Sequence, residues 1–476
     1  MVFDFPASSL SSPRSTSNGT KFPTDFIWGV AGSAWQIEGG LQFGGRGPSV
    51  LDTIGALSPN GTAATPGTND SVIANMHYFL YKQDIARLAA LGVPYYSFSI
   101  SWSRIVPFGL AESPVNTEAL AHYDDVIETC MQYGITPFVT LMHADQPLLV
   151  NISDASLTVN FLFYAKQVMT RYGNRVPYWV TFNEPNILPT FGAASWEGVK
   201  EIVRAHAAVY DWYKEELKGV GQISMKFANN LAIPLNLTDT SHVEAAYRYQ
   251  DYILGIMGSP LFLGEQIPRS VLSTRGVITP FGNEELSQLA GKIDYYSLDA
   301  YTPQLVAPPV GGIDACVNNT QHPLWPICVD VSTYKQADDW LIGQPSNDYS
   351  HIASQYVRQQ VGYVWQTYRP RGIMVSEFGY NAVGEADLPL DTQRYDLLRS
   401  TYYQQYLDEL LKAKQEDGAN VIGALAWSFA DNNEFGSYKQ QYGLQSVNRT
   451  DGTLTRSYKR SFFDLVDWFH AYVESH

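Results

Sequence analysis

The chain has 476 residues, of which 45% are hydrophobic and 16% are charged, a composition typical of a globular protein with a large core. Its formal net charge of −16 argues against nucleic-acid binding, which requires basic patches that displace counterions. No apolar run approaches the roughly 20 residues of a membrane span, so we expect no membrane partner.

Eight short β-branched and aromatic runs alternate with stretches of helical periodicity. The predicted strands are Phe26–Ser33, Tyr95–Ser101, Thr136–His143, Tyr178–Glu184, Gln222–Asn229, Asp294–Tyr301, Gly372–Glu377 and Val421–Phe429. The clearest predicted helices are Tyr81–Leu91, Leu120–Tyr133, Asn160–Tyr172 and Thr392–Lys414. This alternation predicts an α/β fold, specifically a (β/α)8 TIM barrel. A doubly wound sheet also alternates, but the segment GVAGSAWQ after the first strand lacks the G-x-G-x-x-G spacing of a nucleotide turn.

The Ser-rich segment 1–20 has no apolar signal-peptide core, and we expect it to form a disordered tail. No internal repeat or Pro-rich linker divides the remainder, so residues 21–476 are predicted to form one domain. The segments Gly39–Ala74 and Pro303–Ser350 are interpreted as long βα loops at the C-terminal face of the barrel.

Cysteine and glycosylation patterns bear on the cellular location. Cys316 and Cys328 lie in a Pro- and Gly-rich stretch and could close a short loop as a disulfide, whereas Cys130 resembles a small buried hydrophobe. Together with several Asn-x-Ser/Thr sites, some of which chance alone supplies, they favour a secreted glycoprotein. These sites are Asn18, Asn60, Asn69, Asn151, Asn236, Asn318 and Asn448.

Polar side chains gather at the carboxyl ends of the predicted strands, where the active site of such a barrel forms. They are Gln36, His143, Asn183, Glu184, Asn229, Asn230, Asp299, Tyr301 and Glu377, together with the aromatic Trp427. Any one of them could be structural: a lone Glu can form a salt bridge or cap, His143 could be a satisfied core histidine, and Trp427 could belong to the core. Two carboxylic acids at opposing strand ends, Glu184 and Glu377, are nevertheless what glycoside hydrolysis requires.

Four segments resemble glycoside hydrolase family 1, the β-glucosidase family, in order and spacing. They are Phe22–Gly39 (FPTDFIWGVAGSAWQIEG), Thr181–Pro185 (TFNEP), Val375–Gly379 (VSEFG) and Trp427–Phe435 (WSFADNNEF). The resemblance implies that Glu184 is the acid/base, that Glu377 is the nucleophile and that Tyr301 orients Glu377. It also implies that Asn183 holds the sugar 2-hydroxyl, that Gln36, His143 and Glu434 bind other hydroxyls, and that Trp427 forms the floor on which the sugar ring stacks.

Several positions depart from the family pattern. The family usually carries Arg at position 97, where this chain has Ser97, so the ionised form of Glu377 should be less stable unless another cation compensates. The remaining departures are Ala144 and Phe435 in place of Trp, Asp299 in place of Asn and Phe378 in place of Asn. Loss of the indole N–H at position 435 removes a bond to a sugar hydroxyl and puts the preference for glucose in question.

The resemblance therefore predicts a retaining exo-β-glycosidase, foremost a β-glucosidase, that acts on a small β-glycoside or short oligosaccharide through a covalent glycosyl–enzyme intermediate. A transglycosidase with the same catalytic pair, or a non-catalytic carbohydrate-binding relative, are the alternatives. We expect no cofactor and no metal, because the sequence has neither H-E-x-x-H nor clustered Cys and His ligands.

Overall fold

A computed structural model describes residues 21–54, 72–228, 231–332, 334–335 and 340–475. The expected disordered tail 1–20 lies outside the described residues. So do Asn229 and Asn230 and the glycosylation sites Asn18, Asn60 and Asn69.

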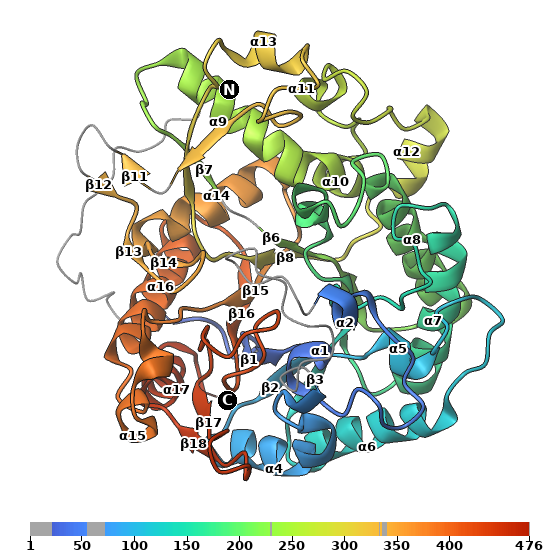
Figure 1. The fold of residues 1–476 in the computed structure, drawn as a ribbon, viewed down its shortest axis with the longest axis vertical. Helices are drawn as coiled ribbons and strands as arrows, with labels where there is room; N and C mark the ends of the chain where they lie inside the picture. Colours follow the sequence, from blue (N-terminus) through green and yellow to red (C-terminus); the bar gives the residue numbers. More distant parts are fainter. Residues whose placement is uncertain (1–20, 55–71, 229–230, 333, 336–339, 476) are drawn as a thin grey trace.

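The centre of the molecule is a parallel sheet that curves into a barrel (Figure 1). Its order is β5-β4-β3-β2-β1-β16-β15-β8-β6. The bounds are β1 Ile27–Gly32, β2 Tyr95–Ser99, β3 Thr136–Met142, β4 Tyr178–Phe182, β5 Gln222–Ser224, β6 Lys226–Ala228, β8 Tyr296–Asp299, β15 Ile373–Phe378 and β16 Val421–Trp427. The predicted (β/α)8 barrel is thereby confirmed.

The fifth predicted strand, Gln222–Asn229, is divided in the structure. Its first part, β5, pairs with β4, and its second part, β6, pairs with β8. Met225 separates the two parts, so the chain passes from one free edge of the sheet to the other at this residue. The prediction of one continuous strand was wrong because hydrophobic periodicity does not register a change of pairing partner.

Helices surround the sheet and bury its outer face (Figure 1). Those that follow the barrel strands are α4 His77–Ala90, α6 Thr117–Gln132, α7 Ser156–Tyr172, α8 Val199–Asp211, α9 Thr240–Gln250, α14 Val357–Tyr368, α16 Leu397–Gln415 and α17 Arg460–Tyr472. The predicted helix Thr392–Lys414 is divided into α15, Leu390–Gln393, and α16. None of the helices in the described part of the chain has the length and apolar character needed to cross a bilayer.

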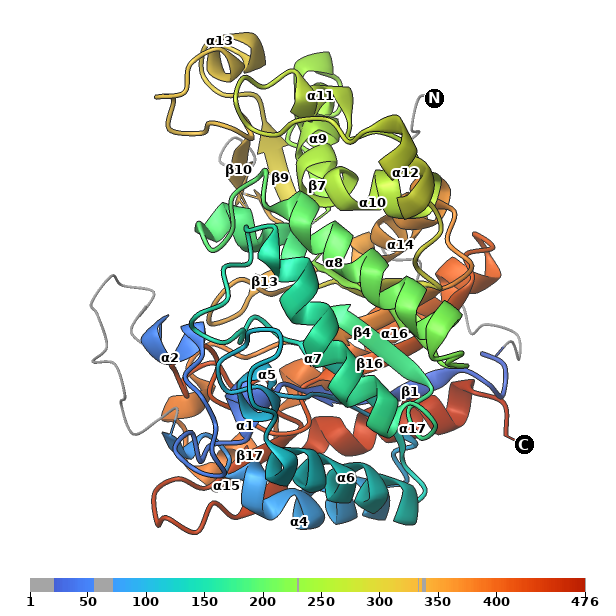
Figure 2. The same ribbon diagram turned by 90° about the vertical axis from the view of Figure 1, so that its right-hand side faces the viewer.

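The loop Pro303–Ser350 contains regular structure of its own. β9 (Gln304–Ala307) pairs with β7 (Ala232–Pro234) and β10 (Asp330–Ser332) in a small sheet. This sheet and α13 (Ile313–Val317) lie at one end of the molecule, beyond the barrel strands (Figure 2). A disulfide joins Cys316 in α13 to Cys328, while Cys130 is free and buried in α6.

A buried ionic network fixes the segment that follows β16. Arg399 of α16 donates to Glu385, and Lys459 bridges Glu385 (2.6 Å) and Asp431 (2.9 Å). Arg399 also pairs with Asp396. Although burial opposes its charge, Arg399 and then Lys459 lower the pKa of Glu385 to about 2. Asp431 therefore occupies a defined position three residues before Glu434.

Removing one partner from this network should leave buried charge without compensation. We expect Lys459→Met to lower the free energy of unfolding by about 3–5 kcal/mol. The control is Lys412→Met, because Lys412 forms a partly solvent-exposed pair with Glu409 (2.6 Å) whose loss should cost less than about 1 kcal/mol. Urea unfolding followed by tryptophan fluorescence measures both, and equal losses would contradict the structural role given to the network.

Candidate active site

The two predicted catalytic glutamates lie at the carboxyl end of the barrel. Glu184 is the second residue after β4, and Glu377 is the penultimate residue of β15, opposite Asp299 of β8. The register of β15 shifts between Val375 and Glu377. Such an irregularity re-aims a side chain, and here it accompanies the arrival of Glu377 at the barrel rim.

Each carboxylate oxygen of Glu377 has its own donor. Tyr301 Oη donates to Oε2 at 3.0 Å, and Lys226 Nζ lies 2.7 Å from Oε1. Glu377 is 3% exposed, so both contacts lie away from bulk solvent. Tyr301 therefore has the contact expected of it, and Lys226 supplies a cation that the sequence reasoning did not identify.

Glu184 occupies an unusual backbone conformation. Its φ of 46° and ψ of 40° lie in the left-handed region, which a non-glycine residue enters at a cost of about 1–3 kcal/mol and mostly at functional sites. Its N–H donates to the carbonyl of Lys226 at 3.0 Å. Exclusion of water first, and then the charges of Asp299 and Glu377, raise the pKa of the Glu184 carboxyl well above its usual value.

Asp299 lies beside this pair and is 1% exposed. Burial, followed by the charge of Glu377, raises the pKa of Asp299 well above its usual value. Its Oδ1 accepts a hydrogen bond of 2.6 Å from Ser376 Oγ.

The expected sugar-binding residues form a continuous wall. The rings of His143 and Trp427 stack with centroids 5.6 Å apart, and Trp427 Nε1 donates to Glu434 Oε2 at 3.4 Å. Asn183 Nδ2 lies 3.3 Å from His143 Nε2. Because burial first and then Lys226 lower the pKa of His143 well below its usual value, its ring is neutral and Nε2 can accept from Asn183.

Two polar side chains of this wall are poised for a further partner. The buried Oδ1 of Asn183 has no hydrogen-bond partner among the described residues. Burial, then the charge of Asp348, raise the pKa of Glu434 to about 8, although the N–H of Trp427 donates to it and opposes the rise. Gln36 lies in α1 (Ala34–Ile37), and its carbonyl accepts from the N–H of Asn433 at 3.1 Å. A neutral Glu434 can both donate to and accept from a hydroxyl.

The departures from the family pattern have different environments. Ser97 is buried in β2 and carries no charge, and Phe378 packs on Tyr402, Tyr403 and Tyr406. Phe378 therefore faces α16. Ala144 and Phe435 both have positive φ, and Phe435 is 47% exposed.

Lys226 and Ser376 are the site residues that the sequence reasoning missed. A usable signal existed for Lys226, because it is a lone charge within the otherwise apolar segment Met225–Ala228, and lysine is rarely fully buried unless it is paired. Nothing comparable marks Ser376. Among the described residues, no group of three or more His, Cys, Asp or Glu side chains is placed to hold a metal ion.

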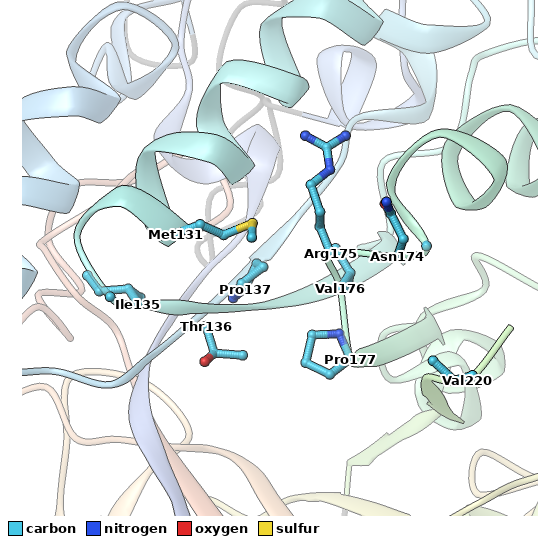
Figure 3. A pocket seen from close by; sticks show the side chains of 11 residues that line it. Met131, Ile135, Thr136, Pro137, Asn174, Arg175, Val176, Pro177 and Val220 are labelled. Atoms are coloured by element: carbon cyan, nitrogen blue, oxygen red, sulfur yellow. The ribbon is translucent and has the colours of Figure 1, made fainter.

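A separate hollow of about 430 Å³ opens at the opposite end of the barrel. Its lining includes Thr136 and Pro137 at the start of β3 and Val176 and Pro177 just before β4 (Figure 3). These residues lie at the amino ends of the strands, whereas the active sites of this architecture form at the carboxyl ends. The hollow is not part of the site described above.

Comparison with known proteins agrees with this geometry. The model of glycosyl hydrolase family 1 matches residues 18–476. Beta-glucosidase 11 of Oryza sativa subsp. japonica is 31% identical over 95% of this chain and 89% of its own length, and Beta-glucosidase 1B of Phanerodontia chrysosporium is 30% identical over 95% and 86%. The solved GH1 beta-glucosidase of the fungus Humicola insolens in complex with glucose superposes with a TM-score of 0.86 at 27% identity, covering 96% of this chain and all of the other.

The family match extends across almost the whole chain and includes both glutamates at the barrel rim. The chain belongs to glycosyl hydrolase family 1 and is a glycoside hydrolase.

Proposed function

We propose that this chain is a retaining, exo-acting β-glucosidase that cleaves a small β-glucoside or short oligosaccharide through a covalent glycosyl–enzyme intermediate. The observation that carries the proposal is that the surroundings of Glu377 favour the ionised carboxylate, whereas those of Glu184 favour the protonated acid. Glu377 is held by the ammonium of Lys226 and the hydroxyl of Tyr301, whereas the raised pKa of Glu184 keeps its proton. A neutral acid facing a carboxylate is the pair that glycoside hydrolysis needs.

In the first step the Glu377 carboxylate attacks the anomeric carbon, and the bond from that carbon to the leaving oxygen breaks. Glu184 gives its proton to the leaving oxygen, so the alcohol departs neutral and Glu184 becomes a carboxylate. The sugar is now an ester of Glu377. Loss of the negative charge on Glu377 also removes one of the charges that raise the pKa of Glu184.

In the second step Glu184 accepts a proton from water as the water oxygen attacks the anomeric carbon. The ester bond to Glu377 breaks, and its electron pair returns to the carboxylate next to Lys226. Two displacements at the same carbon give a product with the starting β configuration. Both glutamates end in their original protonation states.

The wall of the site supports a neutral hexose as the glycone. Asn183, His143, Gln36 and Glu434 present amide, imidazole and carboxyl groups, and Trp427 adds an aromatic surface. Several relatives are named beta-glucosidases, and one solved relative holds glucose. Glucose is therefore the first sugar to test, with Phe435 as the position where preference for other sugars would arise.

We also propose that the protein is secreted and glycosylated. The Cys316–Cys328 disulfide fits an oxidising compartment. Of the glycosylation sites in the described residues, Asn151, Asn236 and Asn318 are exposed and Asn448 is partly exposed.

Mechanism-based labelling tests the nucleophile and the sugar together. A panel of 2-deoxy-2-fluoro β-glycosyl fluorides should inactivate the enzyme with a mass increase of one fluoro-sugar. Peptide mapping should place the adduct on Glu377, with the gluco compound reacting fastest. An adduct on another residue would contradict the assignment of Glu377 as the nucleophile. Absence of labelling by every sugar would favour a non-catalytic carbohydrate-binding protein.

Replacing the acid should separate the two steps. We expect Glu184→Ala to slow hydrolysis of aryl glycosides with poor leaving groups by about 10²–10⁴-fold, because the leaving oxygen is no longer protonated. Glycosides with good leaving groups should lose little in the first step, and added azide should yield a β-glycosyl azide. A similar loss for all leaving groups, with no azide product, would show that Glu184 is not the acid.

A further inference from the structure

Lys226 is a cation inside the barrel. Its side chain is 2% exposed, and it extends from β6 to Glu377 on β15. Burying an ammonium costs several kcal/mol unless a partner compensates, so a fully buried lysine needs an oppositely charged partner. Burial lowers the pKa of Lys226, but the charges of Glu377 and then Asp299 outweigh this and raise it, so Lys226 remains an ammonium.

The side chain of Lys226 passes one intervening strand to contact Glu377. β8 lies between β6 and β15, with Lys226 opposite Ser297 and Glu377 opposite Asp299. Position 97 lies on the other side of β15, beyond β16 and β1. The two positions therefore approach Glu377 from opposite directions around the barrel.

The charges around this lysine come from three further strands or strand ends. Glu377 is in direct contact, and Asp299 and Glu184 interact with it at longer range. His143, at the end of β3, is neutral and is itself held neutral in part by Lys226. Of these carboxyl groups, Glu377 is the one in direct contact with the ammonium.

Tyr301 cannot take over this function. It donates a neutral hydrogen bond to Oε2, and burial followed by the charge of Glu377 raises the pKa of its own hydroxyl well above the usual value. Ser97 carries no charge. Of the groups described around the Glu377 carboxylate, Lys226 is the one that brings positive charge to it.

We propose that Lys226 is the positioning residue that keeps Glu377 ionised and oriented, and that this enzyme supplies the positive charge for its nucleophile from β6 instead of from position 97. The inference rests on the proposed role of Glu377 as nucleophile. It predicts that charge at position 226 and charge at position 97 are interchangeable in part, although the two side chains come from different strands.

The test compares the pH dependence of kcat/KM in the wild type, Lys226→Met and Lys226→Arg. Methionine retains much of the side-chain length without the charge, so we expect kcat/KM to fall about 10–100-fold. The acid limb of its profile should move upward by at least about one pH unit, because loss of an adjacent cation disfavours an ionised carboxylate. Lys226→Arg should keep the acid limb near its wild-type position.

Two further variants separate this role from a structural one. Lys200→Met removes another buried lysine, which lies on α8 and pairs with Glu197 at 2.9 Å, and it should leave the profile unchanged. Adding Ser97→Arg to Lys226→Met should return the acid limb toward the wild-type pH. An acid limb that stays in place in Lys226→Met, or that moves equally in Lys226→Met and Lys226→Arg, would overturn the proposal.

Two control measurements separate loss of the fold and failure of the proposed function from loss of the role of Lys226. Circular dichroism confirms that each variant is folded, and if Lys226→Met does not fold, the Lys226→Arg and Ser97→Arg/Lys226→Met proteins still give the comparison of charge placement. Fluoro-sugar labelling of the wild type at Glu377 establishes the nucleophile independently of Lys226. Failure of that labelling would refute the proposed function, whereas an unmoved acid limb with normal labelling would refute only the role of Lys226.

Discussion

A negatively charged carboxylate buried at the end of a barrel strand is the constraint on which the active site depends. Glu377 is almost fully removed from solvent, and its charge is balanced by Lys226 at 2.7 Å. Burial first, and then this negative charge, raises the pKa of Asp299 and of Glu184, whereas burial first, and then the ammonium, lowers that of His143. Burial and this ion pair together favour the neutral form of Glu184 opposite the Glu377 carboxylate, as the proposed mechanism requires.

The barrel places these groups through local backbone features and distant supports. A register shift in β15 accompanies the placement of Glu377 in the site, and a left-handed conformation follows β4 at Glu184. The buried network of Arg399, Lys459, Glu385 and Asp431 then holds the segment that carries Glu434. Its charges do not contact the catalytic pair, but they determine the position of Glu434 in the sugar-binding wall.

Strands and their ends could be predicted from the sequence because each buried parallel strand is a short apolar run followed by polar residues. This pattern located Glu184, Glu377, His143 and Tyr301 at a common rim. It could not reveal the division of Gln222–Asn229 at Met225, because pairing partners are set by barrel closure.

The contacts within the site were harder to predict. The reach of Lys226 across β8 depends on the relative register of three strands, which a single sequence does not encode locally. The missing Arg at position 97 indicated that a cation was needed, but not which strand would supply it. Phe378, next to Glu377 in sequence, packs on α16, which only the three-dimensional arrangement reveals.

The stereochemistry of hydrolysis is the most direct test of the central claim that Glu377 attacks the sugar while Glu184 protonates the leaving group. Proton NMR can follow the anomeric signals during rapid hydrolysis of an aryl β-glucoside. The account predicts that β-glucose appears first and that the α anomer grows in only by mutarotation. If α-glucose appeared first, water would have attacked the anomeric carbon directly, and Glu377 would not be the nucleophile.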